Sequence, residues 1–160
     1  MRHELPRVAQ TLDYSCGAAC FESMVRHLRG SSPGELYFAE RLGTLTLGYT
    51  PPEKIVELAR AHGFTCEMVT GAEIPELFAQ FRENGVLFVT WWDEDAGHYS
   101  LVKDLDADAI TLMDPWLARE NEDRRIDLPE FEIHWKRRGA RVIRVAAPSE
   151  ADSTNPGPGV

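Results

Sequence analysis

A cysteine followed by a glycine stands where an amphipathic helix is expected to begin. The stretch DYSCGAAC, residues 13–20, leads into apolar residues at three-four spacing, and Gly30 supplies a stop signal. We therefore predict a helix from Cys16 to about Gly30. The unpaired backbone N–H groups and the dipole at the start of such a helix favour a thiolate. Cys16 is thus a candidate nucleophile.

A histidine and an aspartate bracket a predicted hairpin farther along the chain, GHYSLVKDLDADAITLMDPW, residues 97–116. If this segment turns through a three-residue loop at 105–107, His98 lies directly opposite Asp114, with Cβ atoms about 4.5 to 5.5 Å apart on one face of the sheet. A register shift of one residue would send the two side chains to opposite faces. The alternative interpretation is a strand end at His98 and an Asp-Pro turn at Asp114.

These three residue types together favour nucleophilic acyl transfer. His98 would take the proton of Cys16 and later give it to the leaving amine, while Asp114 would orient the imidazole and stabilise its cation. The tetrahedral oxyanion needs hydrogen-bond donors. The backbone N–H of Cys16 and the side-chain amide of Gln10 are the candidates. A solvated surface glutamine is the alternative interpretation of Gln10.

The elements that must position these residues divide the chain in two. Helical spacing, proline near the start and glycine near the end predict further helices at 33–43, 51–63 and 74–85. After Gly85, the β-branched or aromatic runs VLFVTWW, HYSLVKDL, AITLMD and ARVIRVAA, separated by short polar turns, predict an antiparallel sheet. Because helices precede strands without alternating with them, we expect an α+β domain with its helices packed on the sheet.

Length and composition fit one ordinary domain, since 160 residues with 43% apolar content supply a core of useful size. We expect the domain to span 1–146 and to be followed by a disordered tail at 147–160, where Pro, Gly, Ser and acidic residues leave little to bury. No membrane span or signal peptide is evident, so we expect a cytoplasmic protein. The net charge of −9 argues against a nucleic-acid partner.

The remaining cysteines are expected to be structural. Three cysteines without an export signal predict free thiols. Cys16 and Cys20, four residues apart, could form a zinc site together with His27 or Cys66, but this spacing differs from the usual Cys-x-x-Cys pair. Cys20 falls on an apolar helix stripe, and Cys66 alternates with apolar residues in a predicted strand. We therefore predict no metal and no cofactor.

Acidic and aromatic residues precede His98 in WWDEDAGH, residues 91–98. We expect the acids to form a solvated loop; the alternative is that they favour a basic peptide and raise the pKa of His98. Trp91, Trp92 and Trp116 could line a groove, although core packing explains them equally well.

Three segments, VAQTLDYSCGAAC, GHYSLVKDLDADAITLMDP and LPEFEIHW, resemble the bacteriocin-processing cysteine peptidases, which are the double-glycine leader peptidase family, and their stand-alone relatives. The resemblance covers most of residues 5–145. It implies a papain-like fold, a catalytic triad of Cys16, His98 and Asp114, and a contribution of Gln10 to the oxyanion hole.

Two departures from the family pattern bear on the substrate. Members often carry Asp or Thr before the cysteine and Pro after the glycine, whereas this chain has Ser15 and Ala18. The resemblance implies a peptide or protein substrate, with cleavage after glycine-containing sites. A non-cleaving peptide-binding module, a thiol acyltransferase and a thiol redox protein stay open as alternatives, as does the oligomeric state.

Overall fold

Six strands form one antiparallel sheet in the computed structural model, which describes residues 3–92 and 97–148. The strand order is β1-β6-β2-β3-β4-β5, and each neighbouring pair is antiparallel. The strands are β1 (Thr65–Val69), β2 (Val86–Trp91), β3 (His98–Leu105), β4 (Ala109–Met113), β5 (Arg124–Asp127) and β6 (Val142–Ala146).

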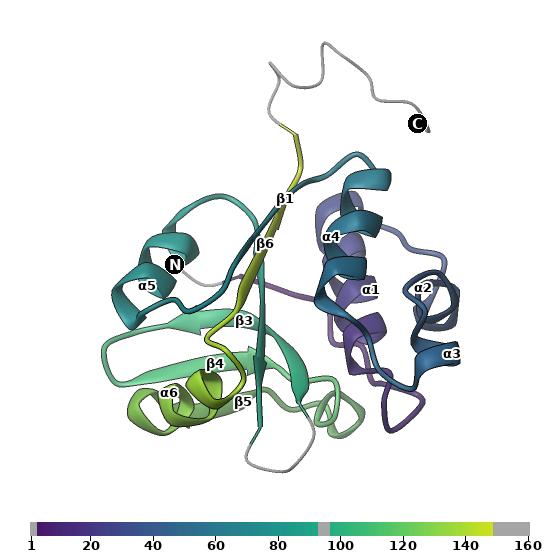
Figure 1. Ribbon diagram of the computed structural model, residues 1–160. Coiled ribbons are helices and arrows are strands. Elements are labelled where there is room, and N and C mark those ends of the chain that lie inside the picture. The colour runs from purple at the N-terminus through teal and green to yellow at the C-terminus, as the bar shows by residue number, and fades with distance from the viewer. Residues whose placement is uncertain (1–2, 93–96, 149–160) are drawn as a thin grey trace.

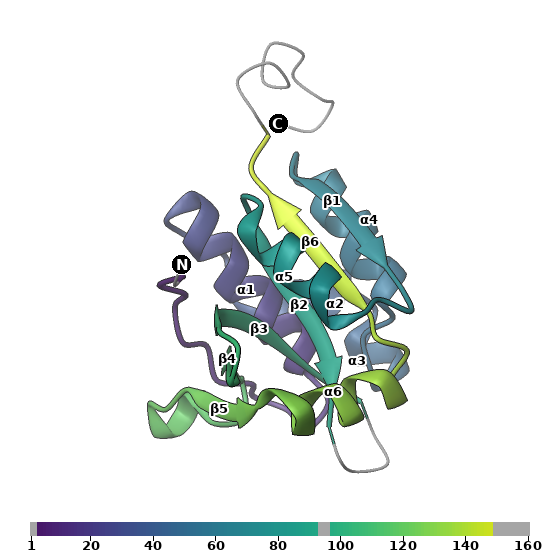
Figure 2. The ribbon, with the colours of Figure 1, turned by 90° about the vertical axis from the view of Figure 1, so that its left-hand side faces the viewer.

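Helices cover both faces of this sheet (Figures 1 and 2). One layer contains α1 (Cys16–Arg29), α2 (Glu35–Arg41), α3 (Thr44–Leu47) and α4 (Pro52–Ala61). The other face carries α5 (Ile74–Arg82) and α6 (Leu128–Arg137). A short 3-10 turn, η1 (Ala118–Glu120), follows β4.

The sheet divides the interior into two apolar clusters, because successive strand side chains point to opposite faces. In β2, Val86 and Phe88 pack toward α1 and α4, while Leu87 and Val89 pack in the cluster that contains Phe131 of α6. All six residues of β2 are buried. A strand buried on both sides explains why VLFVTWW reads as a continuous apolar run.

The predicted α+β architecture is confirmed, and several helices begin and end near the predicted residues. α1 begins at Cys16, and Gly30 ends it with a left-handed φ of 85°, as its stop signal indicates. The helices predicted at 33–43, 51–63 and 74–85 correspond to α2, α4 and α5. Two short elements, α3 and β5, are not predicted by the sequence pattern.

Two expectations fall on residues outside the described part of the chain. They concern the acids of the loop before His98, at 93–95, and most of the predicted tail, at 149–160. Within the residues that the structure describes, no helix has both the length and the apolar character needed to cross a bilayer.

The predicted register of the β3–β4 hairpin is wrong. Next to the turn, Leu105 pairs with Ile110, so four residues, 106–109, connect the pair in place of the three expected at 105–107. Beyond a bulge at Lys103, Leu101 pairs with Met113. One strand therefore carries an extra residue, which displaces all pairs on the far side of the bulge by one position.

The bulge decides which face His98 and Asp114 share. Continuing the register from the turn without a bulge would place the two side chains on opposite faces of the sheet. With Lys103 inserted, Asp114 continues opposite Ser100 and lies diagonally from His98 on the same face. A diagonal contact therefore replaces the direct pair that the sequence predicted, and long side chains still reach across it.

Candidate active site

Cys16 is the first residue of α1 and is nearly buried, with 8% of its surface exposed. The backbone N–H of Tyr99 donates to its sulfur, with an N–Sγ distance of 3.5 Å. Tyr99 belongs to β3, so the start of α1 meets the start of that strand. The sulfur thus combines a helix N-terminus with a second backbone donor from the sheet, and both favour negative charge.

His98 joins the cysteine to the aspartate. Its Nε2 lies 2.5 Å from Oδ1 of Asp114, and interactions with Cys16 contribute to the rise in its pKa. Because Nε2 faces the carboxylate, Nδ1 is the nitrogen left for other partners. The backbone N–H of Tyr99, the next residue, donates to the Cys16 sulfur, so the structure brings Cys16, His98 and Asp114 into one neighbourhood.

The surroundings of His98 favour its protonated form. Burial alone would lower the pKa of His98, but hydrogen bonds and charge interactions with Asp114 and Cys16 outweigh that effect and raise the pKa to about 9. An imidazolium between a carboxylate and a sulfur is thus the stable state of this ring at neutral pH.

Asp114 is fully buried just after the end of β4. The backbone N–H of Trp116 donates to Oδ1 at 2.9 Å, and Nε of Arg124 donates to Oδ2 at 2.6 Å. Burial acts to raise the pKa of Asp114, but these donors together with His98 hold it below its usual value. The aspartate is therefore a carboxylate held on both oxygens.

Sequence reasoning did not identify Arg124. It lies at the start of β5, whose pairing with β4 brings it beside Asp114. The motif EDRRID gives no local signal that one arginine pairs with a buried acid while the next is mostly exposed. Only the strand pairing distinguishes the two.

Two tryptophans pack around the histidine. The ring centroids of Trp92 and His98 are 4.4 Å apart, and Trp91 lies edge-on to the same imidazole at 6.1 Å. Trp92 holds this place with a φ of 142°, a backbone conformation that bulky residues rarely adopt. Two tryptophan rings this close to the imidazole restrict its orientation.

Gln10 is buried, with 1% of its surface exposed, so the interpretation as a solvated surface residue is wrong. Its Nε2 donates to the carbonyls of Leu12 and Asp13, at 2.8 and 3.1 Å. Its Oε1 is buried and has no hydrogen-bond partner among the described residues. Donation to a substrate oxyanion would therefore require Gln10 to exchange one of these two bonds.

Thr50 forms a wall beside the first turn of α1. The Tyr99 hydroxyl donates to its carbonyl at 2.8 Å, and its own hydroxyl lies 2.6 Å from that of Thr44. A Cβ atom on Gly17 would stand 2.7 Å from the Thr50 hydroxyl oxygen. The glycine after the cysteine therefore allows a close approach between α1 and this segment.

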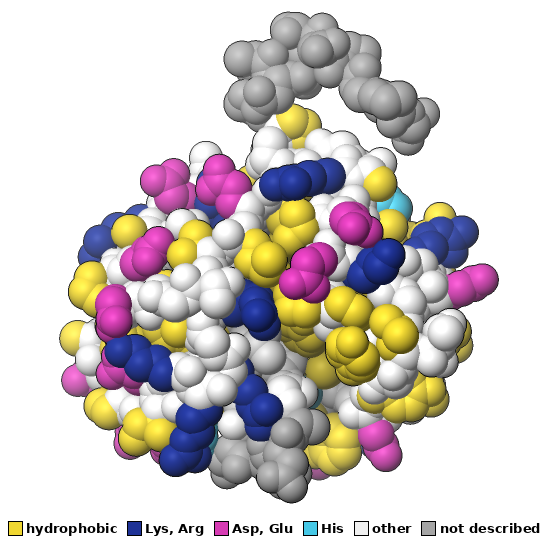
Figure 3. All heavy atoms as spheres, in the orientation of Figure 1, with side chains coloured by type: hydrophobic (Ala, Val, Ile, Leu, Met, Phe, Trp, Pro, Cys, Tyr) yellow, Lys and Arg dark blue, Asp and Glu magenta, His cyan; other side chains and the backbone are white. Residues whose placement is uncertain are grey.

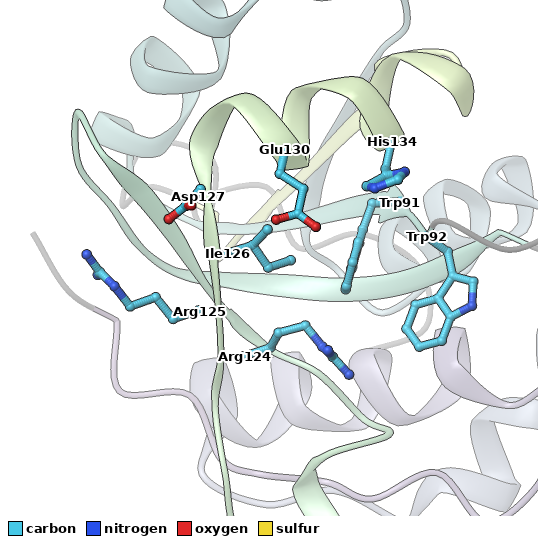
Figure 4. A pocket seen from close by; sticks show the side chains of 8 residues that line it. All are labelled: Trp91, Trp92, Arg124, Arg125, Ile126, Asp127, Glu130 and His134. Atoms are coloured by element: carbon cyan, nitrogen blue, oxygen red, sulfur yellow. The ribbon is translucent and has the colours of Figure 1, made fainter.

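A cavity of about 470 Å³ opens beside Trp91, Trp92 and Arg124 (Figure 4). Glu130 and His134 extend from α6 toward Trp91, and the Arg124 guanidinium lies 5.5 Å and 5.6 Å from the ring centroids of Trp91 and Trp92. The lining residues are Trp91, Trp92, Arg124, Arg125, Ile126, Asp127, Glu130 and His134. Trp91 and Trp92 therefore serve both as packing for His98 and as walls of this cavity.

Cys20 and Cys66 are core thiols, as expected. Both are buried in the apolar cluster between α1 and the sheet. Burial raises the pKa of Cys20 well above its usual value and that of Cys66 to about 11. Over residues 3–92 and 97–148, no group of three or more His, Cys, Asp or Glu side chains is arranged to hold a metal ion.

The architecture is that of papain-like cysteine peptidase domains. The sequence model of the Peptidase C39 family matches residues 4–144, and the chain belongs to this family. An uncharacterized protein of Methanothermobacter thermautotrophicus is 32% identical over 123 residues, which cover 74% of this chain and 78% of the relative.

Two solved structures share the fold. The peptidase domain of Streptococcus ComA, a bi-functional ABC transporter of a quorum sensing pathway, superposes with a TM-score of 0.73 at 21% identity, over 91% of this chain and 99% of that one. A double glycine motif protease from an AMS/PCAT transporter, in complex with its leader peptide, gives a TM-score of 0.73 at 16% identity, over 92% and 94% of the two chains. At these identities the likeness establishes the fold alone.

Proposed function

We propose that this protein is a cysteine peptidase that cleaves peptide bonds through an acyl-enzyme on Cys16. The observation that carries the proposal is the position of His98, whose Nε2 lies 2.5 Å from Asp114 while its neighbour Tyr99 donates a backbone N–H to the Cys16 sulfur. Membership of the Peptidase C39 family supports the reaction class.

In the first half of the reaction, the Cys16 sulfur attacks the carbonyl carbon of the scissile peptide. The carbonyl oxygen becomes an oxyanion next to the start of α1, where the Cys16 N–H is a donor. The C–N bond then breaks as the His98 imidazolium gives its proton to the leaving amine. A thioester on Cys16 and a free amine result.

In the second half, His98 takes a proton from water as the water oxygen attacks the thioester. The C–S bond breaks, the acid product leaves, and the imidazolium–thiolate pair is restored. Asp114 keeps the ring oriented throughout, because it holds Nε2 while Nδ1 exchanges protons with the reacting groups. Contact with the Trp92 ring limits rotation of the His98 imidazole.

A peptide is the substrate class that the surface supports. Exposed apolar side chains lie on α2, on α3 and on the segment that leads to Thr50. They are Leu36, Tyr37, Leu45, Leu47 and Tyr49. Hydrophobic side chains gather on the right-hand side of Figure 3, over the layer of α1 to α4. The solved double glycine motif protease was captured with its leader peptide, which agrees with peptide binding by this fold. An extended peptide with apolar residues on one side of its cleavage site fits this surface.

Selective alkylation tests the proposed nucleophile. Iodoacetamide at pH 6 should modify Cys16 rapidly in the wild type and at least about tenfold more slowly in His98→Ala, because the imidazolium that stabilises the thiolate is lost. Peptide mapping by mass spectrometry reads each cysteine separately. Burial and raised pKa values should leave Cys20 and Cys66 unmodified. Equal rates at all three cysteines would contradict the proposal.

Incubation with a peptide library then separates cleavage from binding. Intact-protein mass spectrometry should trap a thioester on Cys16, and the products should be absent with Cys16→Ala. Peptides that bind wild type and Cys16→Ala equally and stay uncleaved would instead indicate a binding module. Products joined to an added amine would indicate acyl transfer, since the two reactions share the thioester and differ in the acceptor.

A further inference from the structure

The segment between Gln10 and Cys16 is fastened by a single buried carboxylate. Glu35, the first residue of α2, is 7% exposed. Both of its oxygens accept the Thr11 backbone N–H at 3.0 Å, and one accepts the Thr11 hydroxyl at 2.5 Å. The Ser15 hydroxyl donates to the other oxygen. We name residues 11–15 the nucleophile loop.

A buried carboxylate is costly unless donors surround it, and bonds to a charged acceptor are stronger than neutral ones. Within the described residues, the hydrogen-bond donors to the Glu35 side chain all belong to the nucleophile loop. Glu35 therefore acts on the segment that carries the nucleophile, although it is 19 positions away from Cys16 in the sequence.

The contact with Glu35 also changes the role of Ser15. A serine at the N-cap of a helix usually accepts a hydrogen bond from an amide of the first turn. Ser15 occupies the N-cap of α1 but makes no such bond in the described structure. Its oxygen instead accepts the Leu12 N–H at 2.9 Å, and its proton is directed at Glu35.

The first turn of α1 is thereby left uncapped by this side chain. The first helical amide with a backbone partner is that of Ala19, which donates to the Ser15 carbonyl at 3.0 Å. The amides of Cys16, Gly17 and Ala18 come before it, and none of them has a hydrogen-bond partner among residues 3–92 and 97–148, as is usual at a helix start. These donors suit a negative oxygen.

We propose that Glu35 is a positioning residue that holds the nucleophile loop so that the uncapped start of α1 can receive the oxyanion. This inference rests on the proposed function. The partners of the Cys16 sulfur are His98 and the Tyr99 N–H, whereas the partners of Glu35 are in the loop. Glu35 therefore affects stabilisation of the oxyanion far more than the reactivity of the thiol, whose direct partners it does not touch.

Two small reagents separate these effects without a natural substrate. Iodoacetamide reacts with the sulfur by displacing iodide, and no oxyanion forms. p-Nitrophenyl acetate acetylates the sulfur through a tetrahedral oxyanion, with release of p-nitrophenolate and formation of acetyl-Cys16. In Glu35→Gln, acetylation should slow by about 10- to 100-fold, while alkylation of Cys16 should stay within about twofold of wild type.

Glu22→Gln is the matched control. Glu22 is a second buried acid, on α1, whose partners are Arg26 and Ser32. Its substitution should leave the ratio of acetylation to alkylation within about twofold of wild type. Ser15→Ala, which keeps the carboxylate, provides a second variant if Glu35→Gln folds poorly, and should lower the same ratio by about tenfold.

The outcomes are distinguishable. A lower ratio of acetylation to alkylation in Glu35→Gln and Ser15→Ala, but not in Glu22→Gln, supports the inference. An unchanged ratio in both loop variants overturns it, as does an equal fall of the two rates, which would assign Glu35 to the thiol or to the fold. A wild type that is alkylated at Cys16 but never acetylated overturns the proposed function together with the inference.

Discussion

Nε of Arg124 lies 2.6 Å from Oδ2 of Asp114, on the oxygen opposite the one that meets His98. The fully buried carboxylate is thus held between a cation from β5 and an imidazole from β3. Loss of either partner would leave the buried negative charge of Asp114 without one of its two compensating groups. The orientation of His98 consequently depends on a strand that carries no residue of the proposed triad.

Arg124→Gln should destabilise the protein by about 2 kcal/mol, because a buried carboxylate loses a charged donor. Alkylation of Cys16 at pH 6 should slow by about tenfold, since His98 is then less well oriented. Chemical denaturation and the iodoacetamide assay measure the two effects. Arg125→Gln is the matched control. The Arg125 side chain is mostly exposed, and its ion pair with Asp106, at 3.8 Å, is weak, so the substitution should lower the unfolding free energy by less than about 0.5 kcal/mol.

The stability contributed by His98 should depend on pH. Its pKa rises from 6.5 to about 9 on folding, a difference worth about 3 kcal/mol. Since the folded pKa is the higher one, this stabilisation is complete below pH 6.5 and is lost as the pH rises through 9. The difference in unfolding free energy between wild type and His98→Gln should therefore shrink between pH 6 and pH 10. Urea denaturation at several pH values measures it, and a constant difference would contradict the assignment.

Deletion of Lys103 should separate His98 from Asp114, because removal of the bulge shifts β3 by one residue and reverses the face of its side chains. The pKa of His98, followed by NMR of the imidazole, should fall toward its ordinary value. Lys103→Met keeps the bulge residue and removes only the ion pair with Asp123, so the raised pKa of His98 should persist. A raised pKa in the deletion variant would show that another register can form the pair.

Gly17→Ala should destabilise the protein, although alanine is usually the better helix former by about 1 kcal/mol. The new Cβ would lie 2.7 Å from the Thr50 hydroxyl oxygen and 2.8 Å from its Cβ, so α1 and the Thr50 segment would have to move apart. We expect a loss of about 1 to 3 kcal/mol, measured by thermal unfolding. In a Thr50→Gly background the same substitution should cost much less, and an equal cost there would rule out the steric cause.

Local patterns predicted the place of Cys16 at the start of α1 well, because the signals for a helix start lie beside the residue itself. Apolar spacing, Gly30 and the cysteine–glycine pair define where α1 begins and ends within one short stretch. The same holds for Cys20 and Cys66, whose places on apolar stripes predict burial. Their environment is set by neighbours close in the sequence.

Features that depend on strand pairing were beyond such patterns. The bulge at Lys103 has no composition signal, and a shift of one residue there changes every contact toward His98. Arg124 and Glu35 are also ordinary in sequence: one stands in a charged run, and the other is an acid at a helix start, where the dipole alone would account for it. Their partners come from distant segments, so only the assembled sheet and helical layer reveal them.

The position of β6 bears on when the protein becomes competent during its synthesis. This strand is made after each residue of the proposed triad, yet it lies between β1 and β2 and links β1 to the rest of the sheet. A nascent chain that has just exposed Arg124 to solvent outside the ribosome therefore still lacks the strand on which α4 and β1 dock. The sheet that supports the candidate site is therefore completed only when this late segment inserts between β1 and β2.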